Sequence, residues 1–117
     1  MRYTLFLYND ESRLAQIDAA AMEQNKAAFG AYIGSLKEAG IFVDTDWLQP
    51  SSTATTITLK EGEQRIQDGP YADTKEQLGG YFVIDVPNLD VALEWAAKCP
   101  SARYGMVEVR PTAFPSS

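Results

Sequence analysis

Three carboxylates inside strand-like stretches are the strongest candidates for chemistry. Asp46, Asp85 and Glu108 each stand in an alternating apolar pattern rather than on a polar helix face. A carboxylic acid held in a partly apolar cavity has its pKa raised by desolvation, which suits general acid–base work. Asp85 and Glu108 are therefore the predicted catalytic residues. A salt bridge between Glu108 and Arg110, or across a subunit interface, is the simpler structural alternative.

Tyrosines supply hydroxyl groups that could orient a ligand beside these carboxylates. A tyrosine combines an apolar ring with a hydroxyl that needs a hydrogen-bond partner when it is buried. Tyr8, Asp46, Tyr81 and Arg110 are the predicted ligand-binding residues, and the placement of Asp46 depends on a strand register that the sequence leaves open. Packing in the core or at an interface is the default interpretation of each tyrosine.

The composition excludes several kinds of site. The chain has no histidine and a single cysteine, Cys99. A Ser-His-Asp or Cys-His nucleophile system, a zinc site of the usual His/Cys type and an intramolecular disulfide are therefore impossible within one chain. Cys99 lies beside Pro100 at an expected helix end, where a small buried hydrophobe is the favoured interpretation over a reactive thiol. We expect no metal and no cofactor, so any catalysis would be cofactor-free.

The elements that must position these groups follow an order that predicts the fold class. Strands are predicted at 2–8, 41–48, 54–59, 64–67, 81–86 and 106–110, and helices at 19–39 and 89–99. Asp18 and Asn88 are the expected N-caps, and Gly40 suits the left-handed position after the first helix. The order β-α-β-β-(β)-β-α-β predicts an α+β, ferredoxin-like subunit with an antiparallel sheet and an inserted hairpin. Both long helices should cover one face of that sheet.

The last two long strands indicate what the other face of the sheet does. Their core faces are apolar, whereas their opposite faces mix large apolar groups with charges, as in Tyr81, Val83, Asp85, Met106 and Glu108. An exposed apolar patch of this kind commonly marks an interface or a ligand groove. We therefore expect a homodimer in which two sheets face each other around a central cavity.

The segment 68–81, DGPYADTKEQLGGY, joins a turn, a polar stretch and a glycine pair. Asp68 suits an Asx-turn, Gly69 can take a positive φ, and Asp73 or Thr74 can cap a short turn. The glycine pair 79–80 allows another backbone or a ligand to approach closely. These roles are structural. If the loop also borders the cavity, Lys75 or Glu76 would be its polar contact.

Through this segment the chain resembles the YCII-related family and, within it, the DGPF-domain branch. The likeness covers essentially the whole chain, through 1–3, 39–40, 48–50, 68–81, 92–96 and 107–111. It implies a dimeric α/β barrel built on a ferredoxin-like subunit. Tyr71 and Asp73 stand where the family usually has Phe and Glu, and the His-Asp pair proposed as catalytic in the wider family has no counterpart here. Members of this branch often occur beside extracytoplasmic-function sigma factors, which implies a regulatory link.

Length and charge set the remaining limits. The chain has 117 residues, 45% of them apolar, which fits a single domain spanning 1–117. With a net charge of −6 and scattered basic residues, binding to nucleic acid or to an anionic membrane is disfavoured. The start of the chain has no apolar secretory segment, so a cytoplasmic protein is expected.

Two functions stay open at this point. The first is a homodimer that binds a small molecule between its sheets, with or without cofactor-free acid–base activity. The second is a non-catalytic interaction or regulatory module whose acidic surface meets a regulatory protein partner. Replacing Glu108 by glutamine should affect the first function strongly and the second hardly at all. The sequence does not identify the ligand, decide whether the protein is an enzyme, or reach assembly beyond a dimer.

Overall fold

A computed structural model describes residues 1–117 except 71, 73 and 115–117. The strands are β1 Arg2–Asn9, β2 Phe42–Trp47, β3 Thr55–Lys60, β4 Glu63–Asp68, β5 Gln77–Asp85 and β6 Met106–Pro111. The α-helices are α1 Glu11–Leu14, α2 Ala19–Glu38 and α3 Leu89–Lys98. Short 3-10 turns, η1 Ser51–Thr53 and η2 Pro100–Arg103, complete the described elements.

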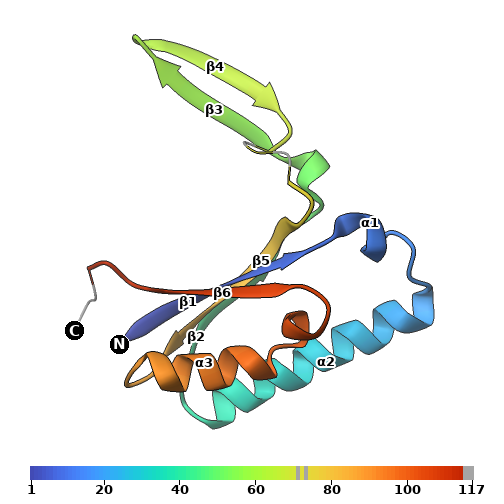
Figure 1. The fold of residues 1–117 in the computed structure, drawn as a ribbon, viewed down its shortest axis with the longest axis vertical. Helices are drawn as coiled ribbons and strands as arrows, with labels where there is room; N and C mark the ends of the chain where they lie inside the picture. Colours follow the sequence, from blue (N-terminus) through green and yellow to red (C-terminus); the bar gives the residue numbers. More distant parts are fainter. Residues whose placement is uncertain (71, 73, 115–117) are drawn as a thin grey trace.

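Four strands form one antiparallel sheet in the order β2-β5-β1-β6, and β3 pairs only with β4 in a separate hairpin. This is the predicted α+β, ferredoxin-like arrangement with a hairpin inserted between β2 and β5. Both long helices, α2 and α3, lie on one side of the sheet, as expected (Figure 1). Within the described residues the sheet ends at β2 and β6 and does not close into a barrel, so the dimeric barrel stays a prediction.

The core lies between the sheet and the two helices. Leu5 from β1, Leu36 from α2 and Ile84 from β5 have no exposed surface. The ring of Tyr32 meets that of Phe82 edge-to-face at 5.1 Å, and its hydroxyl donates to the Trp95 carbonyl at 2.8 Å. Because burial of a side chain of this size stabilises by about 1.5–3 kcal/mol, these contacts hold the helices to the sheet.

Local signals for the helix ends are confirmed. The side chain of Asp18 accepts a hydrogen bond from the Ala21 N–H at 2.7 Å, and that of Asn88 accepts one from the Val91 N–H at 3.0 Å. Gly40 follows α2 with a φ of 73°. Cys99 is fully buried, as predicted, and burial raises the pKa of its thiol.

The main error of the sequence-based prediction concerns the start of β5. The strand was expected to begin at Tyr81, but it begins at Gln77, so the glycine pair lies inside the sheet. A Cβ added at Gly80 would lie 2.7 Å from the main-chain oxygen of Asp46 on β2. A glycine is therefore required where β2 and β5 approach each other. The short helix α1 was not predicted.

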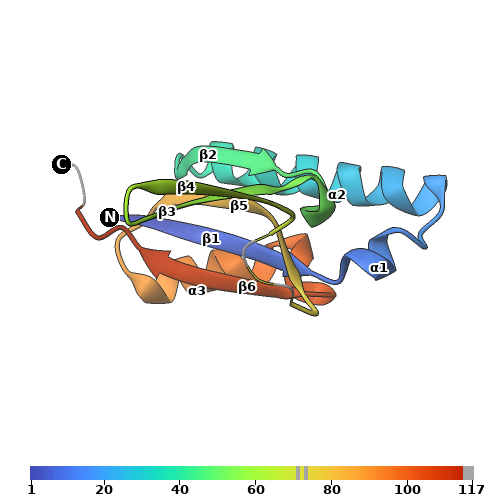
Figure 2. The same cartoon turned by 90° about the horizontal axis from the view of Figure 1, so that it is seen from above.

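The β3–β4 hairpin, hereafter the hairpin arm, lies on the side of the sheet opposite to α2 and α3 (Figure 1). Seen from above, it overlies β1 and β5 (Figure 2). Its turn, Glu61-Gly62, has positive φ at both residues, 52° and 81°, which is the geometry of a tight hairpin turn. At its base, the Glu11 carboxylate accepts hydrogen bonds from the Ser51 N–H and hydroxyl, both at 2.7 Å.

Candidate functional site

A pocket of about 180 Å³ lies between α2 and the sheet, and we call it the α2 pocket. Its apolar wall comes from β1, α2, β2, β5 and the segment after α1: Leu7, Leu14, Phe29, Ile33, Trp47 and Phe82. Its polar residues come from β1, α2, β2 and the segment around η2: Asn9, Asn25, Thr45, Asp46, Ser101 and Tyr104. An apolar pocket with a few convergent polar groups is the usual composition of a small-molecule site.

Aromatic rings form the flat part of the α2 pocket. The ring of Phe29 lies 6.0 Å from that of Trp47 and is stacked on that of Phe82 at 6.4 Å with 10° between the planes. Trp47 is 53% exposed, which places it at the rim. Such a surface favours a flat apolar ligand, because offset stacking adds to the free energy of area burial.

Asn9 carries an unsatisfied polar atom at this pocket. Its Oδ1 is buried and has no hydrogen-bond partner among the described residues. A Cβ at Gly79 would lie 3.0 Å from Asn9 Nδ2, so Gly79 leaves the room that the Asn9 amide occupies. Buried polar atoms are nearly always paired, so Asn9 Oδ1 is expected to accept a hydrogen bond from a bound water or a ligand.

Asn25 and Tyr104 form a completed polar pair in the same pocket. The Tyr104 hydroxyl donates to Asn25 Oδ1 at 3.0 Å, and the Arg13 guanidinium lies 5.0 Å from the centre of the Tyr104 ring. Burial raises the pKa of Tyr104, so its hydroxyl is neutral at physiological pH. Asn25 and Tyr104 therefore make one side of the pocket polar but uncharged.

The uncovered face of the sheet, hereafter the open sheet face, carries most of the residues predicted from the sequence. Pairing across β2, β5, β1 and β6 puts these side chains on one side: Thr4, Phe6, Tyr8, Asp44, Asp46, Tyr81, Val83, Met106, Glu108 and Arg110. The Tyr81 hydroxyl lies 3.2 Å from Asp46 Oδ2 and 3.3 Å from Asp44 Oδ2. Desolvation and these two carboxylates raise the pKa of Tyr81. The register of Asp46, which the sequence left open, is set by its pairing with Tyr81 across β2 and β5.

Glu108 and Arg110 form the salt bridge that was the structural alternative to catalysis. Arg110 Nε donates to Glu108 Oε1 at 3.1 Å, and the guanidinium lies 5.7 Å from the centre of the Phe6 ring. Tyr8 is half-buried and pairs with Met106 across the β1–β6 ladder. The catalytic role of Glu108 and the ligand-binding roles of Tyr8 and Arg110 remain predictions.

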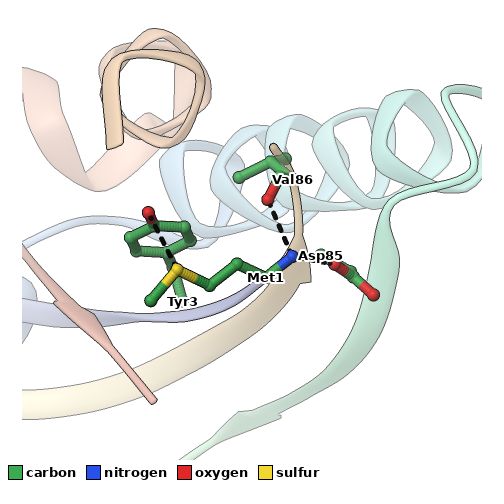
Figure 3. Close-up of polar contacts among 4 residues, drawn as sticks. All are labelled: Met1, Tyr3, Asp85 and Val86. Carbon is green, nitrogen blue, oxygen red and sulfur yellow. Dashed lines mark hydrogen bonds and ion pairs between the residues drawn. The ribbon is translucent and has the colours of Figure 1, made fainter. Parts of the chain in front are cut away.

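Asp85 lies in surroundings opposite to those predicted for a general acid or base. The Met1 ammonium donates to Asp85 Oδ1 at 2.8 Å and to the Val86 carbonyl at 3.0 Å (Figure 3). Because this hydrogen bond and the ammonium charge favour the carboxylate, the pKa of Asp85 is lowered, whereas the cavity hypothesis required a rise.

Asp85 and Glu108 are also far apart in one chain. Asp85 pairs with Arg2, whereas Glu108 pairs with Phe6, four residues further along β1. At about 3.3 Å per residue, that offset alone is roughly 13 Å. The two carboxylates therefore do not meet at one substrate atom within this chain.

Sequence reasoning missed the polar residues of the α2 pocket other than Asp46, which was predicted to bind a ligand and is among the residues that line this pocket. Asn25 stands in the apolar stripe of α2, three residues after Met22 and four before Phe29, and this interruption was a usable signal. Asn9 and Tyr104 carried no comparable signal, because only the fold brings them together.

Comparison with known proteins agrees with this architecture. The family model of the YCII-related domain matches residues 1–113. The chain belongs to the YCII-related family. It is 36% identical over 116 residues to an uncharacterized protein of Rhizobium meliloti (strain 1021), covering 97% of this chain and 94% of that protein. Among the described residues of this YCII-related protein, no helix is long and apolar enough to cross a membrane.

Proposed function

We propose that this YCII-related protein binds a small molecule in the α2 pocket and works as a homodimer through its open sheet face. The observation that carries the proposal is the unpartnered Asn9 Oδ1 beside the stacked rings of Phe29 and Phe82. A ligand with one flat ring and one N–H or O–H donor would satisfy both features. The size agrees, since a cavity of about 150 Å³ accepts benzene in other proteins.

The open sheet face supports the homodimer. Phe6, Tyr8 and Val83 are half-buried there, and Met106 is exposed. Two sheets facing each other at about 10 Å would cover these groups and enclose the Tyr81 hydroxyl with its two carboxylates. The acid–base activity predicted for Asp85 or Glu108 is a narrower form of the proposal. It requires the dimer to desolvate Glu108 and to displace Arg110 from it.

Thermal unfolding with benzamide, phenol and indole as probes tests the α2 pocket. A probe at 100 times its Kd should stabilise the protein by about 2.7 kcal/mol. Ile33→Phe, which fills the pocket, should abolish this gain, whereas Ala27→Phe on the exposed side of α2 should keep it. The proposal is refuted if no probe stabilises the protein, or if both variants respond alike.

Sedimentation equilibrium tests the homodimer separately. The wild-type protein should have twice the chain mass of 12.9 kDa at micromolar concentration. Val83→Lys, which places a charge on the open sheet face, should return the mass to one chain. A wild-type mass of one chain at this concentration would contradict the homodimer while leaving the pocket untouched.

The second candidate function is a non-catalytic interaction or regulatory module that binds a regulatory protein in a sigma-factor circuit. It is supported by the net charge of −6 and by the exposed apolar side chains of the hairpin arm. Loss of partner binding in charge-reversed variants, with Glu108→Gln without effect, would favour it over the first. Unchanged binding after charge reversal would count against it.

A further inference from the structure

The hairpin arm has one face with three large apolar side chains beside Thr55, Gln64 and Asp68, which we call its apolar face, and one face that is polar throughout. Ile57, Leu59 and Ile66 lie on the same side, since Ile57 pairs with Ile66 and strand side chains alternate. These three side chains are 59%, 69% and 66% exposed. The opposite side consists of polar and charged residues: Thr56, Thr58, Lys60, Glu63, Arg65 and Gln67. Alternation of this kind is typical of a hairpin that is covered on one side.

The arm is held away from its own core by polar contacts at its base. Besides the Glu11–Ser51 hydrogen bonds, the Thr56 hydroxyl donates to the Gly69 carbonyl at 3.0 Å. An isolated two-stranded hairpin is at best marginally stable in water. Its apolar face therefore needs a cover that this chain, in the described residues, does not supply.

Interface area indicates what that cover is. Strands spaced about 4.8 Å apart and paired over about six residues give the open sheet face a footprint of roughly 400 Å². A stable interface buries about 800 Å² on each partner. A two-stranded arm of the same length has a face of roughly 200 Å². In a twofold dimer each copy offers both its open sheet face and its arm, roughly 600 Å² in projection, so the arm brings the interface nearer to the area that a stable dimer buries.

We propose that the apolar face of the hairpin arm packs against a second copy of this chain. This inference rests on the proposed homodimer and adds the element that completes its interface. The arm overlies the open sheet face on the side away from α2 and α3, so one second copy can meet both surfaces (Figures 1 and 2). The charged side of the arm then stays in water.

A matched pair of double variants tests the proposal. Ile57→Asn with Ile66→Asn alters a cross-strand pair on the apolar face, and Thr58→Asn with Arg65→Asn alters one on the polar face. Sedimentation equilibrium should show the first variant dimerising about 100-fold more weakly, about threefold for each of the four substituted side chains in the dimer, and the second within about threefold of wild type. Circular dichroism checks that both variants keep the fold.

Amide hydrogen exchange provides the second measurement. In the wild type, exchange over 55–68 should slow as the protein passes from the monomeric to the dimeric concentration range. A wild type that stays monomeric overturns both the homodimer and the role of the arm. A dimer that Val83→Lys dissociates, but in which the Ile57/Ile66 variant and arm exchange are unchanged, overturns the role of the arm alone.

Discussion

Replacing Asn9 by leucine is expected to stabilise the protein and to remove its affinity for the probes. Asn9 Oδ1 is buried without a partner, and such an atom costs about 1–3 kcal/mol. Leucine has a similar shape and no polar atom, so the substitution recovers most of that cost. Its methyl groups are bulkier than the amide, and some overpacking beside Gly79 offsets part of the gain. The expected net gain is about 1 kcal/mol.

Asn25→Leu is the matched control, because both asparagines line the α2 pocket but only Asn25 has a partner. Removing its amide leaves the Tyr104 hydroxyl without its acceptor, which should destabilise by about 1 kcal/mol or more. Urea unfolding gives both free energies, and the melting temperatures should move in opposite directions by roughly 4 °C each. Probe titrations on the same samples should show lost affinity in Asn9→Leu.

A loss of stability in Asn9→Leu would refute this reasoning. It would mean that the Asn9 amide is satisfied in solution by a bound water, so the pocket would hold no unpaired group for a ligand. A gain in stability with unchanged probe affinity would refute only the predicted contact between the ligand and Asn9. Opposite signs for the two asparagines are therefore the decisive result.

Three further predictions concern the strand contact, the hydroxyl cluster and the thiol. Gly80→Ala should destabilise by about 1–3 kcal/mol in urea unfolding, because its Cβ would meet the Asp46 oxygen at 2.7 Å; an unchanged midpoint would contradict the close approach. Asp46→Asn should lower the pKa of Tyr81 toward about 10 in an ultraviolet titration. Because folding favours the neutral hydroxyl of Tyr81, this group contributes stability below about pH 10. The contribution is lost as the pH rises through the higher pKa that Tyr81 has in the folded protein. Cys99 should react with a thiol reagent only as fast as the protein unfolds, since it is buried and its pKa is raised; fast reaction in the native state would show otherwise.

Features of the fold that depend on neighbouring residues could be predicted from the sequence. The caps at Asp18 and Asn88 and the left-handed Gly40 are local, because each involves a hydrogen bond or a dihedral angle within a few residues. The split of β5 into a core face and an open face is local too, since side chains alternate along a strand. The ferredoxin-like order follows from these elements.

The start of β5 could not be predicted in this way. Gln77, Gly79 and Gly80 have weak strand preference. They are extended because Gln77 pairs with β1 and Gly80 pairs with β1 on one side and with β2 on the other. Tertiary pairing overrides local propensity here. It also explains the glycine pair as a contact between strands rather than as part of a loop.

The residues of the candidate site show the same difference between local and long-range information. The sequence by itself determined that Tyr81, Glu108 and Arg110 share the open sheet face, because period-two alternation is a property of each strand. Only the tertiary structure decided which of these groups meet, because register across strands depends on distant pairing and on the irregularity between Phe42 and Asp44. The α2 pocket depends wholly on the tertiary structure. Its polar residues come from four separate parts of the chain, β1, α2, β2 and the segment around η2, and only the packing of α2 and η2 on the sheet brings them together.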